Sequence, residues 1–196
     1  MKIAIFGGSF NPVHLDHIKL AISCGEEFGL DKIIFIPTYK TPLKENSEIA
    51  SADDRLNMCK LAVRDLKNLE VSDIEIKRKG LSYTSDTIKA FVKDYKNLHI
   101  IVGADMFMTL DQWHEYEYIF ENATIIAYPR NDFDCEKLRI KYDEYKKYGC
   151  KALISKHRVG NISSTLIRQK IKDNQDVSDF LDGAVIEYIN KRNLYR

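Results

Sequence analysis

The chain of 196 residues lacks the features that mark membrane, secreted or zinc-binding proteins. No stretch approaches the roughly 18 consecutive apolar residues of a membrane-spanning helix, and the N-terminus runs into a strand pattern with no visible signal peptide. The four cysteines are scattered, with no Cys-x-x-Cys pair and no zinc-ligand spacing. We therefore expect a cytoplasmic protein with reduced thiols and no membrane partner.

An excess of charge of one sign is also missing. The 30 lysines and arginines nearly balance the 29 aspartates and glutamates, for a formal net charge of +1. Proteins that bind nucleic acids normally carry a basic excess, so we expect no nucleic-acid partner. Apolar residues make up 44% of the chain, which is enough for the core of one domain.

Short apolar runs alternate with helix-like patterns along the chain. Ile33–Ile36 and Ile100–Val102 are apolar throughout, which is typical of strands buried on both faces of a parallel sheet. The alternation predicts a doubly wound, Rossmann-like α/β fold, with a parallel sheet flanked by helices. We expect a single domain over 1–196, with a small C-terminal helical portion from about residue 162. Strands are predicted at 2–6, 32–37, 69–76, 98–102, 123–128 and 151–155, and helices at 56–66, 84–95, 132–148, 164–172 and 184–192.

The segment 7–17, with the sequence GGSFNPVHLDH, carries most of the chemical information. Its paired glycines allow a sharp turn and close approach of a ligand. The helix that follows offers unpaired N–H groups and the positive end of its dipole, which favour phosphate. His14 and His17 lie three residues apart and share a helix face. The segment is neither a Walker A loop nor a Gly-x-Gly-x-x-Gly fingerprint, which disfavours a redox Rossmann enzyme.

A second phosphate site is indicated near the C-terminus. Ser163 or Ser164 is expected to cap a helix, and Arg168 follows one turn later. Hydroxyls, helix N-terminal N–H groups and a guanidinium all bind oxygen-rich anions well. Taken alone, these residues also fit a capped helix with an exposed arginine, just as the histidines alone fit a solvent-facing turn. Asp105 alone fits a cap of a helix over 106–110, and Trp113 alone fits an ordinary core residue.

The complete string GGSFNPVHxxH resembles the signature of the nucleotidyltransferase superfamily that carries a His/Thr-x-Gly-His motif. Within it, the chain resembles bacterial nicotinate-nucleotide adenylyltransferases over nearly its full length. The resemblance implies in-line transfer of AMP from ATP to nicotinate mononucleotide, giving nicotinate adenine dinucleotide and pyrophosphate in NAD biosynthesis. The other segments that carry the resemblance are 37–44 (PTYKTPLK), 82–84 (SYT), 103–105 (GAD) with Trp113, 129–130 (PR) and 162–168 (ISSTLIR).

The resemblance also implies roles for the matched residues. Trp113 would stack on the pyridine ring, and backbone N–H groups near Thr84 and His114 would receive the nicotinate carboxylate. Mg²⁺ would be bound through the ATP phosphates, with no protein ligand. His14 and His17 would be catalytic; Gly7, Gly8, Ser9, Phe10, Gly103, Asp105, Ser163, Ser164 and Arg168 would bind ATP; and Lys44, Thr84, Trp113, His114 and Arg130 would bind nicotinate mononucleotide.

Asp16 departs from the family pattern, which has glycine at that position. A carboxylate there would repel ATP unless Mg²⁺ or His17 screens it or it faces away, and it would raise the pKa of a neighbouring histidine. We expect activity with altered ATP affinity. Three alternatives stay open, namely nicotinamide mononucleotide as the acceptor, phosphopantetheine as the acceptor, which the nicotinate-pocket segments disfavour, and a nucleotide-binding module weakened by Asp16. A homodimer is one assembly that the chain could form.

Overall fold

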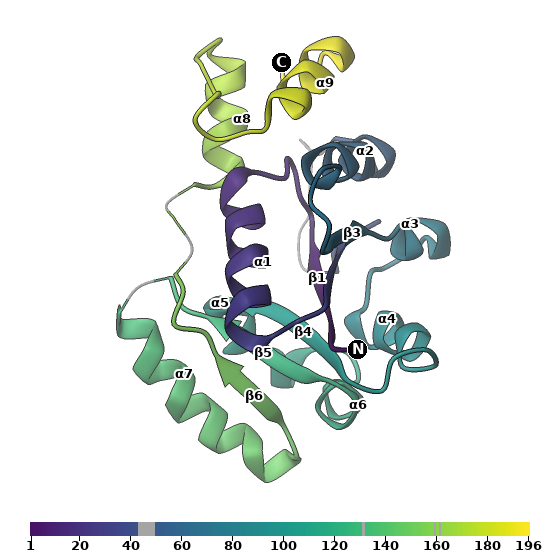
Figure 1. Ribbon diagram of the computed structural model, residues 1–196, viewed down its shortest axis with the longest axis vertical. Coiled ribbons are helices and arrows are strands. Elements are labelled where there is room, and N and C mark those ends of the chain that lie inside the picture. The colour runs from purple at the N-terminus through teal and green to yellow at the C-terminus, as the bar shows by residue number, and fades with distance from the viewer. Residues whose placement is uncertain (43–49, 131, 159, 161) are drawn as a thin grey trace.

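The computed structural model describes residues 1–42, 50–130, 132–158, 160 and 162–196 (Figure 1). Its strands form one sheet in the order β3-β2-β1-β4-β5-β6, and every neighbouring pair is parallel. The predicted doubly wound parallel fold is therefore confirmed. The strands are β1 (Ile3–Gly8), β2 (Lys32–Pro37), β3 (Leu69–Val71), β4 (Leu98–Gly103), β5 (Thr124–Tyr128) and β6 (Lys151–Ile154).

The helices cover both faces of the sheet and one of its ends. Figure 1 shows α8 and α9 at the end of the molecule where β1 finishes and α1 begins. The α-helices are α1 (Leu15–Phe28), α2 (Ala52–Val63), α3 (Ile74–Arg78), α4 (Thr84–Phe91), α5 (Ala104–Phe107), α6 (Tyr116–Asn122), α7 (Asp132–Tyr145), α8 (Ser164–Lys172) and α9 (Gly183–Arg192), with 3-10 turns at Leu110–Gln112 and Lys146–Tyr148.

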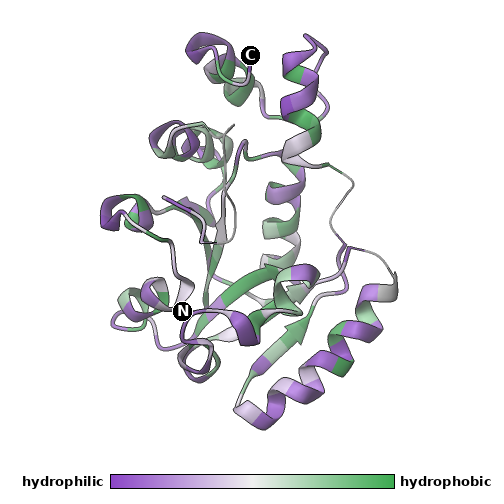
Figure 2. Cartoon of the chain, turned by 180° about the vertical axis from the view of Figure 1, so that it is seen from behind, coloured by the Kyte–Doolittle hydropathy of each residue, from purple (hydrophilic) through white to green (hydrophobic). Residues whose placement is uncertain are grey.

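The alternating strand residues build a hydrophobic core on each face. Ala4 and Phe6 of β1 point to a cluster shared with α1, α2, α8 and α9. Ile3 and Ile5 point to a second cluster, shared with α4, α5, α6 and α7. Figure 2 shows the same layering, with apolar strands inside and hydrophilic residues on the outward helix faces. The C-terminal helices thus pack into the same core as the strands.

The strand order determines where ligands are expected. The order in which strands are added to the sheet reverses between β1 and β4, because the chain moves outward from β1 through β2 to β3 and then returns to β4 on the other side of β1. Open parallel sheets bind ligands at such a switch point, beyond the carboxyl ends of the strands. Gly8 and Gly103 are the last residues of β1 and β4, so the predicted site lies at this crevice.

The predicted strand at 69–76 is wrong in its second half. β3 ends at Val71, and α3 begins at Ile74. The alternation of Ile74, Glu75 and Ile76 suggested a strand, but Glu75 is buried and its carboxylate accepts a 2.7 Å hydrogen bond from Thr87 of α4. The contact between α3 and α4 therefore outweighed the apolar–polar alternation that predicted a strand.

None of the helices in the described ranges has the length and apolar character needed to cross a membrane.

Candidate active site

The glycine turn after β1 is built around a buried aromatic ring. Phe10 has a φ of 45° and is 2% exposed, and its ring packs against Phe6, Phe35 and His17. A Cβ on Gly8 would lie 3.1 Å from the Phe10 ring, a tight contact that favours glycine at this position. Phe10 therefore supports the turn from inside the core.

Arg55 of α2 holds the turn through backbone carbonyls. Its guanidinium donates to the carbonyl oxygens of Ser9 at 2.7 Å, Thr38 at 2.6 Å and Ala50 at 3.1 Å. Arg55 is 2% exposed, and the sequence analysis gave it no role. The sequence did contain a sign that Arg55 is buried and paired. Arg55 lies four residues before Cys59 and so shares its apolar helix face, where a charged side chain needs hydrogen-bond partners.

Asn11 joins this turn to the C-terminal end of the chain. Its Oδ1 accepts hydrogen bonds from the Ala50 N–H at 3.1 Å and from the Tyr195 hydroxyl at 2.8 Å. Asn11 is 4% exposed. The sequence analysis missed both Asn11 and Tyr195, and no local pattern could pair residues 184 positions apart.

His14 and His17 form a stacked pair at the start of α1. The backbone N–H of His14 donates to Nδ1 of His17 at 3.2 Å, and the two ring centroids lie 3.6 Å apart. Because Nδ1 of His17 accepts this hydrogen bond, the proton of a neutral ring is on Nε2, which is then a donor. The pair therefore offers the Nε2–H group of His17 at the helix start, where the backbone N–H groups of Leu15 and His17 already donate to the carbonyls of Phe180 and His14.

Both imidazoles are held in the neutral form. Burial lowers the pKa of His14 to about 4, and Asp16 opposes this effect only in part. Burial and then the neighbouring His14 lower the pKa of His17 well below its usual value. Asp16 does act to raise the pKa of His14, as expected, but desolvation of the charged form outweighs the carboxylate, so the net shift is downward.

The second predicted phosphate site lies against the first. Ser163 is the N-cap of α8, with its Oγ accepting from the Leu166 N–H at 3.1 Å. Ser164 donates its hydroxyl to the carbonyl of Pro12 at 2.9 Å. Arg168 donates through Nη1 to the carbonyl of Asn11, also at 2.9 Å. Segments that are about 150 residues apart in the sequence thus form one hydrogen-bonded unit.

The carboxyl end of β4 brings Asp105 and Arg130 together. Arg130 Nη2 lies 3.1 Å from Asp105 Oδ2, so the structure pairs two residues that were predicted to bind different substrates. A Cβ on Gly103 would lie 2.7 Å from Asp105 Oδ1, so a larger residue there would require the Asp105 carboxylate to move. Asp105 lies inside the first turn of α5, whose N-cap is Gly103, so the alternative of Asp105 as a cap is wrong. Both charged residues line a pocket of about 320 Å³ together with Ala104, Met108, Asp134, Lys137 and Leu138.

The residues predicted to hold nicotinate lie on two neighbouring segments. Thr84 is the first residue of α4, and the ring of Tyr83 just before it lies 4.3 Å from the ring of His114. Trp113 packs against the second core cluster, and its indole Nε1 is buried without a hydrogen-bond partner. Lys44, the remaining predicted residue, lies outside the described residues.

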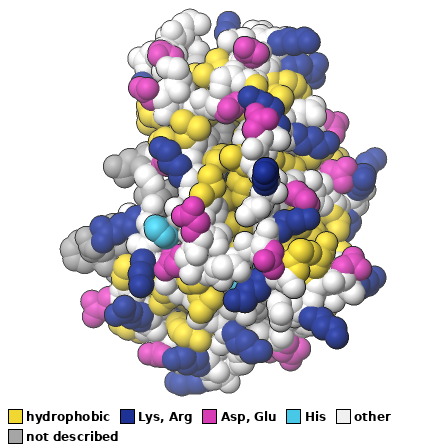
Figure 3. All heavy atoms as spheres, viewed as in Figure 1, with side chains coloured by type: hydrophobic (Ala, Val, Ile, Leu, Met, Phe, Trp, Pro, Cys, Tyr) yellow, Lys and Arg dark blue, Asp and Glu magenta, His cyan; other side chains and the backbone are white. Residues whose placement is uncertain are grey.

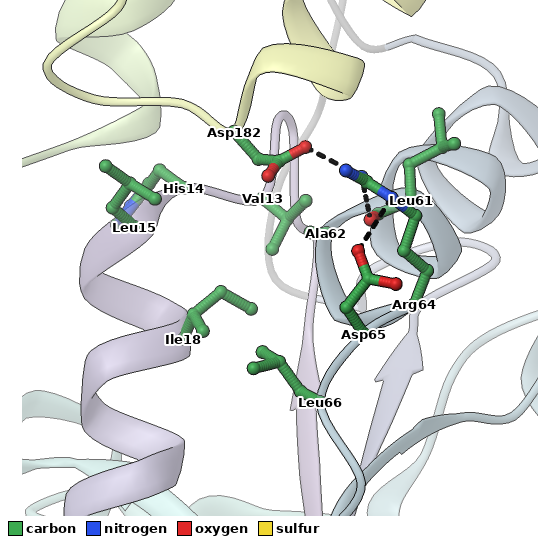
Figure 4. A pocket seen from close by; sticks show the side chains of 10 residues that line it. All are labelled: Val13, His14, Leu15, Ile18, Leu61, Ala62, Arg64, Asp65, Leu66 and Asp182. Carbon is green, nitrogen blue, oxygen red and sulfur yellow. Dashed lines mark hydrogen bonds and ion pairs between the residues drawn. The ribbon is translucent and has the colours of Figure 1, made fainter.

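A separate pocket of about 180 Å³ opens beside the start of α1, between α2 and Asp182 (Figure 4). Among the residues that line it, only His14 belongs to the predicted site, and Arg64 donates to Asp182 at its rim. On the face shown in Figure 3, basic and acidic side chains are interspersed, in keeping with the balanced net charge.

Comparisons with known proteins agree on one family. The family model described as cytidylyltransferase-like matches residues 5–170. A curated protein from Clostridium botulinum, named probable nicotinate-nucleotide adenylyltransferase, is 34% identical over 197 residues, which covers 100% of this chain and 98% of that protein. A protein of the same name from Dehalococcoides mccartyi is 37% identical over 201 residues, with coverage of 100% and 97%.

Solved structures share the fold. The nicotinic acid mononucleotide adenylyltransferase of Plasmodium falciparum, in complex with NaAD, aligns with a TM-score of 0.77 at 20% identity, covering 99% of this chain and 97% of that one. A putative nicotinate-nucleotide adenylyltransferase from Vibrio parahaemolyticus aligns with a TM-score of 0.69 at 22% identity, covering 100% and 96%. At these identities the structural likeness supports the fold, and the sequence relatives identify the family.

Proposed function

This chain belongs to the cytidylyltransferase-like family and, within it, to the nicotinate-nucleotide adenylyltransferases; from that premise we propose that it transfers AMP from ATP to nicotinate mononucleotide. The products are nicotinate adenine dinucleotide and pyrophosphate, and the reaction belongs to NAD biosynthesis. The observation that carries the proposal is the neutral, stacked His14–His17 pair at the start of α1, joined by hydrogen bonds to the start of α8.

The reaction requires positioning more than covalent catalysis by the protein. A phosphate oxygen of the mononucleotide attacks the α-phosphorus of ATP, an O–P bond forms, and the bond to pyrophosphate breaks on the opposite side. Negative charge grows on the phosphate oxygens, and oriented N–H donors in a site with little water stabilise it most. We assign this task to Nε2–H of His17, with the ring of His14 stacked beside it.

The other proposed ATP-binding residues lie mainly in the turn after β1 and at the start of α8, the two segments joined by hydrogen bonds. Gly7, Gly8 and Ser9 would lie under the phosphates, and a Cβ on Gly7 would meet no protein atom within 4 Å, so protein packing alone does not explain that glycine. Ser163, Ser164 and Arg168 would hold the β- and γ-phosphates, because a guanidinium has five N–H donors and only some of those of Arg168 are used within the protein. Gly103 and Asp105 would lie near the ribose, and Phe10 would contribute by supporting the turn.

The acceptor site would select nicotinate through its carboxylate. Backbone N–H groups at Thr84, in the first turn of α4, and at His114 can donate to a carboxylate, whereas the NH₂ of nicotinamide cannot accept these hydrogen bonds. Trp113 would stack on the pyridine ring. Arg130 and Lys44 would bind the phosphate of the mononucleotide, which requires Arg130 to share or leave its ion pair with Asp105.

Mg²⁺ enters the proposal as part of the Mg–ATP substrate. The described residues contain no group of three or more His, Cys, Asp or Glu that could hold a metal ion. In the proposal the cation is carried by the substrate phosphates, whose oxygens are ligands that Mg²⁺ prefers. When bound, the ion offsets charge on the triphosphate. We also propose that 1–196 act as one nucleotidyltransferase domain, in the cytoplasm and as a homodimer, and light scattering after size-exclusion chromatography tests the assembly.

Pyrophosphate release tests the function directly. The assay contains Mg–ATP and compares nicotinate mononucleotide with nicotinamide mononucleotide at equal concentrations. We expect release mainly with the nicotinate form. Equal rates with both acceptors would contradict the carboxylate pocket, and ATP binding without release from either would favour a nucleotide-binding module.

A further inference from the structure

Asp16 is chemically out of place in the family motif, yet the structure gives it partners. It lies in the first turn of α1 and is 6% exposed. Its Oδ2 accepts a hydrogen bond of 3.1 Å from the backbone N–H of Ile162, which is 146 residues away in the chain. The carboxylate is therefore directed at the segment that leads into α8.

Gly160 is shaped to this carboxylate. A Cβ on Gly160 would lie 2.4 Å from Asp16 Oδ2 and 2.8 Å from its Cγ, distances that no real Cβ contact adopts. The backbone of Gly160 is not in the left-handed region, so its conformation alone does not require glycine. Gly160 has no side chain, and the Asp16 carboxylate occupies the space that a side chain there would take. The two residues are therefore sterically complementary.

The placement of this pair ties the two proposed phosphate-binding segments together. Asp16 is adjacent to His17, and Ile162 is adjacent to Ser163, so one hydrogen bond connects neighbours of both groups. With the bonds from Ser164 to Pro12 and from Arg168 to Asn11, it is the third bond between the start of α8 and the motif segment.

We propose that Asp16 is a positioning residue that fastens the segment before α8 to α1, and that Gly160 is its obligate partner. The inference rests on the proposed function, since it assigns both segments to ATP phosphates. A glycine at position 16 would leave the Ile162 N–H without this acceptor, and any side chain at position 160 would displace either the Asp16 carboxylate or the segment. The negative charge of Asp16 is directed at a backbone amide, and the positive end of α1 favours it there.

A double-mutant cycle tests the pair. The variants are Gly160→Ala, Asp16→Gly and the combination, and the primary measurement is the dissociation constant of Mg–ATP by calorimetry with no acceptor present. We expect Gly160→Ala alone to weaken ATP binding by about 10-fold, because contacting residues couple by amounts of this order. In the Asp16→Gly background, the same alanine should have little further effect, because the carboxylate it would strike is gone.

Two further variants separate positioning from charge and from general instability. Asp16→Asn keeps an oxygen that can accept from Ile162 and should bind ATP within about twofold of the parent. Gly183→Ala is the matched control, because a Cβ on Gly183 meets no atom within 4 Å; it should leave ATP affinity unchanged and, as an alanine in the first turn of α9, should not lower the melting temperature. The melting temperatures should show the same coupling: Gly160→Ala should lower the melting temperature of the parent but should have little further effect in the Asp16→Gly background.

The possible contrary results are distinct. If Gly160→Ala weakens binding equally in both backgrounds, the fit between the two residues is refuted. If Asp16→Gly or Asp16→Asn tightens ATP binding several-fold, the carboxylate repels the triphosphate and the positioning role is refuted. Because ATP binding is measured without an acceptor, a failure to adenylylate nicotinate mononucleotide would refute the proposed function and leave this test intact.

Discussion

At the scale of single residues, burial decides the charge of the catalytic pair. Two imidazole rings whose centroids are 3.6 Å apart would repel if both were protonated, and the low dielectric around them disfavours either charge. Neutral histidines donate through N–H groups without attracting the triphosphate as cations would. The cationic donors of the proposed site are therefore arginine and, by the sequence, lysine.

The first prediction concerns His17. His17→Asn should lower kcat by about 100-fold or more, since removing one donor aimed at developing charge has effects of that size. KM for nicotinate mononucleotide should stay close to that of the parent. Pyrophosphate release at saturating substrates measures this. His157→Asn, at an exposed histidine in the loop after β6, is the control and should leave the rate unchanged; a loss of less than threefold at position 17 would contradict the assignment.

The second prediction concerns pH. The pKa of His14 is lowered from 6.5 to about 4 in the folded chain, so between these values the unfolded chain binds more protons than the folded chain. Stability therefore rises with pH through this window and is lost as the pH falls from 6.5 towards 4. Urea unfolding across the window should show that His14→Asn loses less stability than the parent, by a difference on the order of 3 kcal/mol. If the free energy of unfolding changed with pH in the same way for both proteins, the lowered pKa of His14 would be contradicted.

At the scale of elements, the site depends on what the start of each helix contacts. α1 and α8 both begin at the end of the molecule where β1 finishes, and the protein itself occupies some of their first N–H groups, since Leu15 N–H donates to Phe180 and Leu166 N–H donates to Ser163. In the part of the chain that the structure describes, three hydrogen bonds join the start of α8 and Ile162 before it to the motif segment, so a shift of α8 away from that segment would break them. A change at the α8 cap should therefore affect nucleotide binding as well as helix stability.

The third prediction compares two serine caps. Ser163 caps α8 by accepting from Leu166 N–H, and Ser51 caps α2 by accepting from Asp54 N–H at 3.0 Å. Replacing either by alanine should cost about 1 kcal/mol in the free energy of unfolding. Only Ser163→Ala should also raise KM for ATP. Unfolding curves and ATP titrations of both variants decide the matter, and an equal change in KM for both would remove Ser163 from the site.

At the scale of the whole molecule, the two cores on either side of the sheet protect the thiols. Cys24, Cys59 and Cys150 are buried, whereas Cys135 on α7 is half-buried. Burial raises the pKa of Cys24 and Cys150 to about 12 and raises that of Cys59 strongly as well. Since the thiolate is the reactive form, these three side chains act as packing groups, as the scattered cysteine pattern predicted.

The fourth prediction follows from this protection. In the native protein an aromatic disulfide reagent should label Cys135 first, and the other three thiols should react only at the rate of global unfolding. In Cys135→Ser the early phase should disappear. Rapid labelling of more than one thiol in the native parent would show that one of the cores opens locally.

How much could be predicted from the sequence differs between the fold and the site. The apolar runs at Ile33–Ile36 and Ile100–Val102 were sufficient for the parallel sheet, because strands buried on both faces leave a continuous hydrophobic pattern. The predicted element boundaries were wrong where a side chain bonds to another element. The predicted strand 69–76, for example, includes Glu75, which accepts a hydrogen bond from Thr87 of α4 and lies in a helix. The locations of His14, His17 and Ser163 at helix starts were predictable, because helix starts have local residue preferences.

The sequence by itself determined the class of fold, the family, and which segments carry phosphate chemistry, since all three depend on order and spacing along the chain. Only the tertiary structure decided how those segments meet. The pairing of Asp16 with Ile162 and Gly160 and of Asp105 with Arg130, the buried carbonyl contacts of Arg55 and the neutral state of the histidines each depend on distance or desolvation. Those quantities arise from residues far apart in the chain, so no local pattern encodes them.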